Sequence, residues 1–397
     1  MTVQPLRRVF KIVNGGTPTS ERENWDGDVA WATPVDLGRL NGSRISKTQR
    51  TLTAEGLRTG SSLVPAGSLI VSTRAPIGYV AETTTPMALN QGCRGLVPRT
   101  ELEVRFFRYQ LLVSEGQLQA RGQGSTFVEL STDALACFPL VVPPLATQRA
   151  IADYLDAETA KLDQIVKCLA QANLLLDEWL ETEIETTIWS GDGTDMPLMH
   201  LTPGDRQIQY GIVLPGPDVP NGVRIVKGGN IVTGHLNAAG LARTTHEIEA
   251  GFVRSRLRRN DIVFAIRGAV GACAMVPEEV EGANITQDVA RVSPLPGLEP
   301  SWLLYALTSR TLQRQVESRV VGATIRGVNI RDLKRVRVPV PTPVAQRRKA
   351  EALGESQAHR DHVWARRQRQ IDLLMERRQA LITAAVTGQL EIPGVAA

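Results

Sequence analysis

One segment of this sequence occurs twice, and the repeat constrains the fold more than any other feature. Residues 143–149 read PPLATQR, and residues 341–347, placed 198 positions later, read PTPVAQR. Three further pairs of segments match in the same order: 68–78 with 261–271, 90–98 with 286–294, and 122–135 with 320–333. Ordered self-similarity is typical of a chain built from copies of one structural unit. We therefore expect two homologous units in tandem.

Each unit has the same internal order. It begins with a region rich in Gly, Pro, Thr and Val, in which short β-branched runs alternate with turn residues, as in a mainly β domain with a few helices. A long proline-free stretch with helical spacing of its apolar residues follows and predicts one long helix. The fold class is therefore α+β, with a first globular domain at 1–144, a central helix at 145–190, a second globular domain at 191–343, a C-terminal helix at 344–388 and a tail at 389–397.

The first long helix has a clear apolar stripe. Its members fall at spacings of three and four and are Ile151, Leu155, Leu162, Ile165, Leu169, Ala172, Leu176 and Trp179. The stripe of the second helix is thinner, and Arg360 and Arg367 lie near it. The alternative is that each helix folds back on its own domain, but a helix of about 60 Å is longer than such a domain requires.

The two predicted helices differ in charge. Residues 148–190 carry 3 basic and 9 acidic side chains, whereas residues 346–388 carry 9 basic and 5 acidic ones. We expect the helices to pair antiparallel as a coiled-coil spacer, with acidic residues against basic ones. The spacer would separate two globular domains related by pseudo-two-fold symmetry.

Motifs and composition disfavour the main enzyme classes. A nucleotide-binding P-loop ends in Gly-Lys-Ser/Thr, and the dipeptide Gly-Lys is absent from the sequence. The Pro143-Pro144 pair lacks the preceding Asn or Asp and the following aromatic residue of DNA amino-methyltransferases. His359 and His362 have no evident third metal ligand, and two solvated side chains explain them as well. Without a membrane-spanning run or a signal peptide, we expect a cytoplasmic protein that has no membrane partner.

Four segments resemble one family over nearly the whole chain. They are residues 15–37 (GGTPTSERENWDGDVAWATPVDL), 68–78 (SLIVSTRAPIG), 143–156 (PPLATQRAIADYLD) and 373–390 (LLMERRQALITAAVTGQL). With the order of variable region, helix, variable region and helix, they are similar to the specificity (S) subunit of Type I restriction–modification systems. The GGTP segment has no evident counterpart in the second unit, where residues 210–231 fill its place with different chemistry.

The resemblance implies a subunit that binds double-stranded DNA and performs no catalysis. Each globular unit would be a target recognition domain for one half of a bipartite, asymmetric site, in a system for DNA methylation and phage defence. The helices would set the half-site spacing and dock two methyltransferase subunits, and restriction subunits would join the full complex. S-adenosylmethionine, ATP and Mg would be bound by the partner subunits, and this chain would bind no cofactor. The residues expected to contact partner subunits are Gln148, Arg149, Leu155, Leu176, Gln346, Arg347, Leu353 and Leu374.

Candidate DNA contacts lie in the loops of both units. Arg and Lys favour guanine, while Asn and Gln suit adenine, and further polar side chains position the protein on phosphates. In the first unit the candidates are Lys47, Arg50, Arg74, Gln91, Arg94, Arg121, Gln123 and Ser125. In the second unit they are Lys227, Asn230, Arg243, Arg267, Gln287, Arg319, Arg326 and Asn329.

The repeated candidates have structural alternatives. Arg74 aligns with Arg267, and each begins an Arg-x-x-x-Gly turn; in the structural alternative, the glycine only supplies an unusual backbone angle. Gln91 aligns with Gln287, which suits a shared scaffold better than base discrimination. Discriminating residues should differ between the repeats, which favours the loops that hold Gln123–Ser125 and Arg326–Asn329. The competing hypothesis for the whole chain is a scaffold that assembles subunits through its helices without reading DNA.

Overall fold

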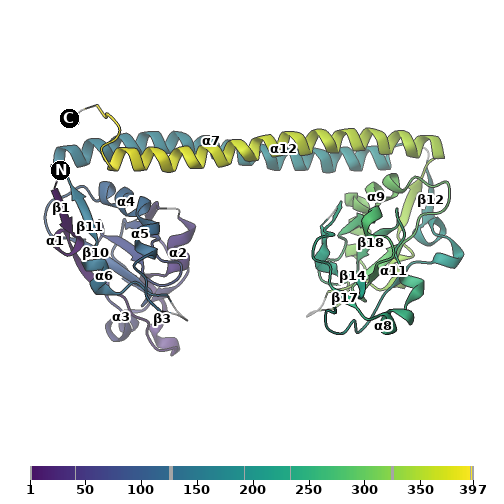
Figure 1. The fold of residues 1–397 in the computed structure, drawn as a ribbon, viewed down its shortest axis with the longest axis horizontal. Coiled ribbons are helices and arrows are strands. Elements are labelled where there is room, and N and C mark those ends of the chain that lie inside the picture. Colours follow the sequence, from purple (N-terminus) through teal and green to yellow (C-terminus); the bar gives the residue numbers. More distant parts are fainter. Residues whose placement is uncertain are drawn as a thin grey trace. The chain divides into compact units, whose positions relative to one another are not determined.

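The chain divides into two compact units, each containing one β-rich part and a portion of both long helices (Figure 1). Unit 1 comprises Met1–Leu169 and Arg369–Ala397, and unit 2 comprises Ala170–Gln368. The structure is a computed structural model that describes residues 2–40, 42–124, 128–191, 193–232, 234–322, 326–393 and 395. The predicted α+β class, with two β-rich domains and two long helices that pack together, is confirmed.

The two long helices are α7 (Leu145–Trp189) and α12 (Pro343–Val386). Prolines precede both of them, where a helix tolerates the missing N–H group. Gly191 has a φ of +86° just after α7, a conformation that typically ends a helix. With 45 residues at a rise of 1.5 Å each, α7 extends about 68 Å.

A two-stranded antiparallel ribbon leads into each long helix. In unit 1, β1 (Thr2–Pro5) pairs with β11 (Pro139–Val142). In unit 2, β12 (Thr194–Pro197) pairs in the same way with β22 (Arg337–Val340). The segments that contain β1 and β12 read TVQPL and TDMPL, a further match between the repeats that the sequence comparison above does not include.

A glutamine fastens the start of each long helix to the β-rich part. Gln148 Nε2 donates to Pro143 O at 2.8 Å, and its Oε1 accepts from Glu103 N at 3.0 Å. Gln346 makes the same pair of bonds in unit 2, at 2.9 and 3.0 Å. These four bonds give a physical reason for the repeated Pro-to-Gln-Arg segment, because the amide must reach both the proline carbonyl and a neighbouring helix.

Unit 1 contains a five-stranded sheet, β2-β10-β7-β8-β4, and a four-stranded sheet, β5-β3-β9-β6. The strands are β2 (Phe10–Asn14), β3 (Trp25–Ala32), β4 (Arg44–Ile45), β5 (Thr51–Leu52), β6 (Leu63–Val64), β7 (Leu69–Ser72), β8 (Val80–Thr83), β9 (Met87–Leu89) and β10 (Cys93–Pro98). The helices are α1 (Leu6–Val9), α2 (Pro34–Arg39), α3 (Ala54–Gly60), α4 (Val104–Val113), α5 (Glu115–Gln119) and α6 (Thr132–Ala136). In Figure 1, α3 and β3 lie at the end of unit 1 away from the long helices.

Unit 2 contains a four-stranded sheet, β13-β21-β18-β19, whose order repeats β2-β10-β7-β8, and two smaller sheets, β17-β14-β20 and β15-β16. The strands are β13 (Gln209–Tyr210), β14 (Val223–Val226), β15 (Ile231–Val232), β16 (His235–Leu236), β17 (Arg243–Thr244), β18 (Ile262–Ala265), β19 (Cys273–Met275), β20 (Asn284–Ile285) and β21 (Val289–Val292). The helices are α8 (His246–Ala250), α9 (Pro300–Thr308), α10 (Arg310–Glu317) and α11 (Ile330–Leu333). The matched segments of the sequence therefore form matched strands.

The Arg-x-x-x-Gly segments form the turns from β7 to β8 and from β18 to β19. Gly78 and Gly271 have φ values of +101° and +96°, which L-residues with a Cβ rarely adopt. Each glycine N–H donates at 3.0 Å to the carbonyl of the last residue of the preceding strand. A Cβ at Gly271 would also lie 2.0 Å from Gln313 Oε1. The expected backbone role of these glycines is confirmed.

Both long helices complete the hydrophobic core of each unit. In unit 1, Leu155 of α7 and Ile382 of α12 lie in one buried cluster with Phe107 of α4. In unit 2, Ile188 of α7 and Leu353 of α12 lie in the main buried cluster. Full burial of one such side chain contributes about 1.5–3 kcal/mol. Each β-rich part thus packs on an end of both helices. The alternative, in which each helix packs on its own domain, is therefore correct for the contacts at the helix ends.

Acidic residues of α7 face basic residues of α12 in both units, as predicted. In unit 1, Arg378 Nε lies 3.0 Å from Asp163 Oδ1. In unit 2, Arg360 Nη1 lies 3.4 Å from Asp177 Oδ1. Rising residue numbers in α7 meet falling numbers in α12, so the pairing is antiparallel.

The buried face of α7 differs from the predicted stripe in its middle part. Ile165 and Trp179 are 47% and 42% exposed, whereas Thr159 and Asn173 are buried. The buried positions follow the 3.5-residue spacing of paired helices, and polar side chains occupy two of them. Arg367 of α12 reaches the same level and donates from Nη1 to a main-chain carbonyl of α7 at 3.0 Å.

Candidate nucleic-acid interface

Several predicted loop residues of unit 1 meet at the neck of a β-hairpin. Gln123 and Glu129 exchange two backbone hydrogen bonds of 3.0 Å and so close the loop between them. The residue after Glu129 bonds to the residue before Arg74 at 2.8 Å, which attaches the neck to the end of β7. The predicted contact Ser125 belongs to the part of this loop that lies outside the described residues.

Glu129 binds two arginines at this hairpin neck. Its Oε2 accepts from Arg74 Nε at 3.1 Å, and its Oε1 lies 3.6 Å from Arg94 Nη2. The side chain of Arg74 is 47% exposed and that of Glu129 is 34% exposed, whereas Arg94 is only 12% exposed. Two guanidinium groups around one carboxylate leave a net positive cluster, with Arg74 as its solvent-facing member.

Arg94 is engaged inside the unit and supports this cluster. Its Nη1 donates to the carbonyls of Gln91 and Cys93 at 2.9 and 3.0 Å, and its Nε donates to Thr132 Oγ1 at 3.1 Å. With Nη2 beside the glutamate, each of its nitrogens has a partner within the protein. In the structure, the predicted DNA contact Arg94 holds Glu129 in place, and the predicted contact Gln91 is exposed next to it.

Unit 2 repeats the hairpin neck without these charges. Val321 and Gly327 exchange backbone bonds of 2.9 and 3.0 Å, and Gly327 forms a β-bridge with Arg267. In the matched segments Gly327 stands at the position of the glutamate, and Ala290 stands at the position of the second arginine. Arg267 keeps the place of the first arginine and is exposed. The two units therefore present different side chains on one backbone scaffold.

Arg50 lies on a pair of tryptophans elsewhere in unit 1. Its Cζ is 3.5 Å from the ring centroid of Trp25 and 5.6 Å from that of Trp31. The two rings meet edge to face at 5.1 Å, and their Nε1 atoms donate to main-chain carbonyls in the segment that begins with GGTP. A guanidinium over an aromatic face is restrained while its charge stays in solvent. Arg50 and Lys47 are exposed basic residues of a segment that is separate in sequence from the hairpin neck.

The loop residues of unit 2 that were predicted to contact DNA bond mainly to other groups of the protein. Asn329 Oδ1 accepts from Asp332 N at 2.9 Å, which makes Asn329 the N-cap of α11 and gives it a structural role. Arg326 is exposed and pairs with Glu317. Arg319 donates to a carbonyl of α10. Of these three predicted contacts, Arg326 keeps the most accessible guanidinium.

The remaining predicted DNA contacts are dispersed. Asn230 Oδ1 accepts from Lys227 N at 2.8 Å, so the amide shapes the turn after β14. Arg243 is exposed and donates to a main-chain carbonyl at 3.0 Å. Arg121 lies 4.8 Å above an aromatic ring of unit 1, and Gln287 is half-buried. The hairpin necks are therefore the places where predicted contacts gather.

Half of the residues predicted to bind partner subunits are buried instead. Gln148, Leu155, Gln346 and Leu353 are 4%, 0%, 2% and 1% exposed. The two glutamines fasten the helix starts and the two leucines fill the cores, so the structure gives these four side chains structural roles. The other four are accessible to different degrees: Arg149 and Arg347 are exposed, and Leu176 and Leu374 are half-buried.

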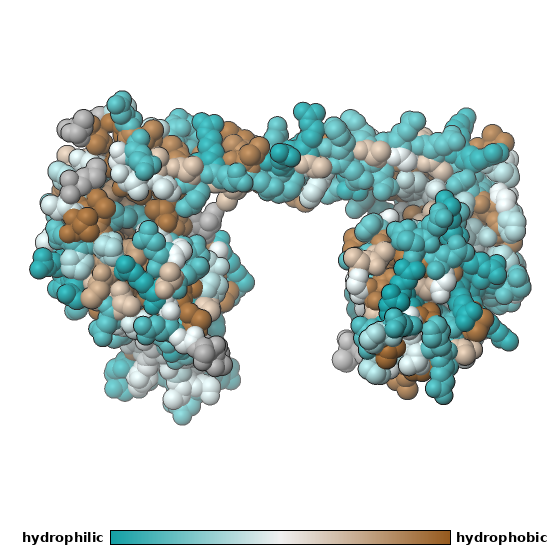
Figure 2. Space-filling model, viewed as in Figure 1, coloured by the Kyte–Doolittle hydropathy of each residue, from teal (hydrophilic) through white to brown (hydrophobic). Residues whose placement is uncertain are grey.

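Several apolar side chains of the long helices are exposed, and the stripe predicted from the sequence did not distinguish them from the buried ones. We call them the helix-pair surface: Ile165, Leu174, Leu175 and Trp179 on α7, and Val344, Trp364, Leu373 and Met375 on α12. Figure 2 shows scattered hydrophobic residues among mostly hydrophilic ones along the long helices, on the face drawn there. Leu174 and Leu175 are 62% and 56% exposed.

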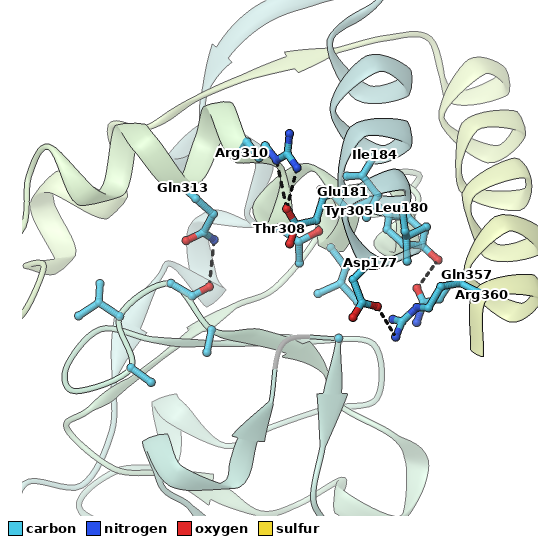
Figure 3. Close-up of a pocket in the computed structure, with 16 residues that line it drawn as sticks. Asp177, Leu180, Glu181, Ile184, Tyr305, Thr308, Arg310, Gln313, Gln357 and Arg360 are labelled. Carbon is cyan, nitrogen blue, oxygen red and sulfur yellow. Dashed lines mark hydrogen bonds and ion pairs between the residues drawn. The ribbon is translucent and has the colours of Figure 1, made fainter. Parts of the chain in front are cut away.

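A pocket of about 710 Å³ lies in unit 2 where α9 and α10 meet the long helices (Figure 3). Its charged residues bind each other, since Arg310 Nη2 lies 2.9 Å from Glu181 Oε2 and Arg360 Nη1 lies 3.4 Å from Asp177 Oδ1. The Tyr305 hydroxyl donates across to α12 at 3.0 Å. Among the described lining residues there is no predicted DNA contact. The pocket lies where the β-rich part of unit 2 packs against the long helices.

Other chemistries lack a suitable arrangement in the part of the chain that the structure describes. Within that part, no group of three His, Cys, Asp or Glu side chains is placed to hold a metal ion. Cys93 and Cys273 are buried, and burial raises the pKa of each thiol to about 12, which keeps them unreactive. The search of the described helices also found none with the length and apolar character that a membrane crossing needs.

Comparison with known proteins shows what the chain is similar to. Residues 1–171 match the Type I restriction modification DNA specificity domain. The chain is 26% identical over 348 residues to the Type I restriction enzyme EcoBI specificity subunit of Escherichia coli, covering 81% of this chain and 73% of that protein.

The fold is also found in solved structures. One chain belongs to a structure of the type I R-M system described in terms of complex assembly and conformational transition. It aligns with a TM-score of 0.73 and 16% identity over 98% of both chains. The HsdS subunit from Thermoanaerobacter tengcongensis aligns with a TM-score of 0.50 and 17% identity over 98% of this chain and 97% of that one. On the domain match and the similarity to EcoBI, residues 1–171 match the DNA specificity domain, and the chain is similar over most of its length to the non-catalytic specificity (S) subunits of Type I restriction–modification systems.

Proposed function

We propose that each β-rich unit reads one half of a bipartite, asymmetric DNA site. The observation that carries this proposal is the repeated hairpin neck, which keeps its backbone bonds but changes its side chains. Unit 1 has Glu129 and Arg94 where unit 2 has Gly327 and Ala290. A shared scaffold positions each reader on the duplex, and different loop side chains then select different bases.

The long helices suit a fixed spacing between the two readers. Successive base pairs rotate as well as advance, so the readers need a set distance and phase, which a flexible linker does not maintain. Half-sites read from one side of the duplex lie about 34–36 Å apart. A helix such as α7, about 68 Å long, is sufficient to span that distance.

The helix-pair surface is the proposed docking site for two methyltransferase subunits. Its apolar side chains are exposed, and the charged side chains of Arg149 and Arg347 lie at the starts of the same helices. S-adenosylmethionine would be bound by those partner subunits, and ATP and Mg would be bound by the restriction subunits of the full complex. In this arrangement the partner subunits perform the catalysis, and this chain selects the DNA sequence.

A scaffold that assembles subunits without reading DNA is the second candidate. It would use the same helices, but it gives no reason for two large units that share a backbone and differ in their exposed loops. Specific retention of a duplex that carries a bipartite motif separates the two functions, because a scaffold would not discriminate between duplexes.

Methylome sequencing tests the proposal. Cells that express this chain with its methyltransferase subunit should show one methylated bipartite motif with a fixed gap. A second strain should carry one extra heptad in both helices, after Leu169 and after Gln368, which keeps the seam in register because the seam itself repeats every seven residues. The insertion lengthens the pair by about 10 Å and should change the gap or abolish methylation. A continuous motif, or an unchanged gap in the insertion strain, would contradict the proposal.

A further inference from the structure

The cluster at the hairpin neck of unit 1 leaves one arginine positioned with its outer nitrogens available. Glu129 binds Arg74 through Nε at 3.1 Å, on the inner edge of the guanidinium. Among the described residues, Nη1 and Nη2 of Arg74 have no hydrogen-bond acceptor. These two nitrogens are the parallel donors that match O6 and N7 of guanine in the major groove.

Glu129 is itself held in place from several directions. Its backbone exchanges two bonds with Gln123, and its carboxylate lies between Arg74 and the largely buried Arg94. The 34% exposed carboxylate is therefore neutralised by two cations before any DNA approaches. This removes the repulsion that an unpaired carboxylate would exert on phosphates and leaves a fixed, positively charged donor pair.

We propose that Glu129 is the positioning residue that fixes Arg74 for the bidentate recognition of one guanine in the half-site read by unit 1. The inference rests on the proposed function and adds a specific residue pair to it. A guanidinium fixed at Nε loses little freedom on binding, so the correct base gains a preference that a mobile side chain would not give. Unit 2 has glycine at the glutamate position, so Arg267 lacks this fixation and the two half-sites differ in stringency.

The test is a selection from a random-sequence DNA library by the full chain in complex with its methyltransferase subunit. Four variants are compared with the wild type: Arg74→Lys, Glu129→Ala, their double variant, and Glu278→Gln. The last removes an exposed carboxylate paired with Arg259 in unit 2 and controls for the change of charge. Circular dichroism and thermal unfolding confirm that each variant is folded.

The wild type should select guanine at one position of one half-site. Arg74→Lys keeps the charge but loses the fork, so the preference for guanine there should fall by about 5- to 150-fold, the range that one bidentate contact provides. Glu129→Ala should reduce the same preference at the same position, and should add little in the Arg74→Lys background because both act through one contact. Glu278→Gln should leave all positions unchanged.

Three results would overturn the inference. If Arg74→Lys lowers the affinity for all sequences equally, the side chain contacts a phosphate. If Glu129→Ala leaves the selected motif as it is, or acts independently of Arg74, the carboxylate does not position the arginine. If the wild type selects no motif at all, the proposed function falls together with this inference, and that outcome is distinguishable from the other two.

Discussion

Replacement of Asp156 by asparagine should destabilise unit 1 specifically. Asp156 on α7 accepts hydrogen bonds from Arg105 at 2.8 Å, Arg108 at 3.1 Å and the Tyr109 hydroxyl at 2.6 Å, all from α4. Burial alone raises the pKa of Asp156, but the bonds from Tyr109 and Arg105 and the charge of Arg108 outweigh it, so the pKa lies below its usual value. The carboxylate therefore joins the β-rich part to the long helix in its charged form.

The magnitude follows from these contacts. Asp156→Asn removes the charge that balances Arg108, whose side chain is only 7% exposed and whose other acidic neighbour lies 3.6 Å away. Hydrogen bonds to charged groups contribute about 1.5–3 kcal/mol each, and the 32% exposure of Asp156 reduces the net loss to about 2 kcal/mol. For a domain of about 150–250 residues, this lowers the melting temperature by about 4–8 °C.

Differential scanning calorimetry of the full chain measures the effect. The matched control is Asp153→Asn, because Asp153 also pairs with Arg105 at 2.9 Å but is 68% exposed, and an exposed pair contributes about 0–1 kcal/mol. A lowered carboxyl pKa stabilises the fold above the unfolded value of about 3.9 and loses this contribution as the pH falls. The gap between wild type and Asp156→Asn should thus be constant from pH 7 to about 4 and close below it. Equal shifts for the two variants, or a gap that widens in acid, would refute the reasoning.

Two further predictions concern DNA binding and the helix pair. Affinity for DNA should fall steeply between 50 and 200 mM salt, since neutralised phosphates release counterions; a binding titration that shows the same affinity across this range would contradict phosphate contact. Asn173→Leu should stabilise the helix pair by about 1 kcal/mol, because the buried Asn173 Oδ1 has no hydrogen-bond partner in the described residues; a lower unfolding temperature in the variant would show that this amide is satisfied in solution.

The architecture was predictable because short segments of the sequence determine it. Prolines before each long helix, Gly191 after α7 and the uninterrupted helical spacing mark α7 and α12 within a few residues of their ends. The matched segments predicted matched strands, since the same residues meet the same turn geometry at Gly78 and Gly271. The apolar stripes, the helix lengths and the opposite charge totals together predicted that the two helices pair.

Side-chain roles were less predictable because they depend on neighbours far along the chain. Gln148 resembled a surface residue of a helix start, yet its amide is buried between two main-chain groups, one of them 45 positions away. Ile165 fitted a 3.6-residue stripe, but the pair follows a shorter repeat that buries Asn173. Glu129 was not singled out, because its importance appears only when the fold brings Arg74 to it across 55 positions.

An exchange experiment tests the central claim most directly. Residues 191–343 are replaced by the corresponding segment of a specificity subunit with a different target, both long helices are kept, and the methylome is sequenced. The account predicts that one half of the bipartite motif is unchanged, that the other half becomes that of the donor, and that the gap is preserved. A motif that changes in both halves, or in neither, would contradict the claim that each unit reads its own half-site.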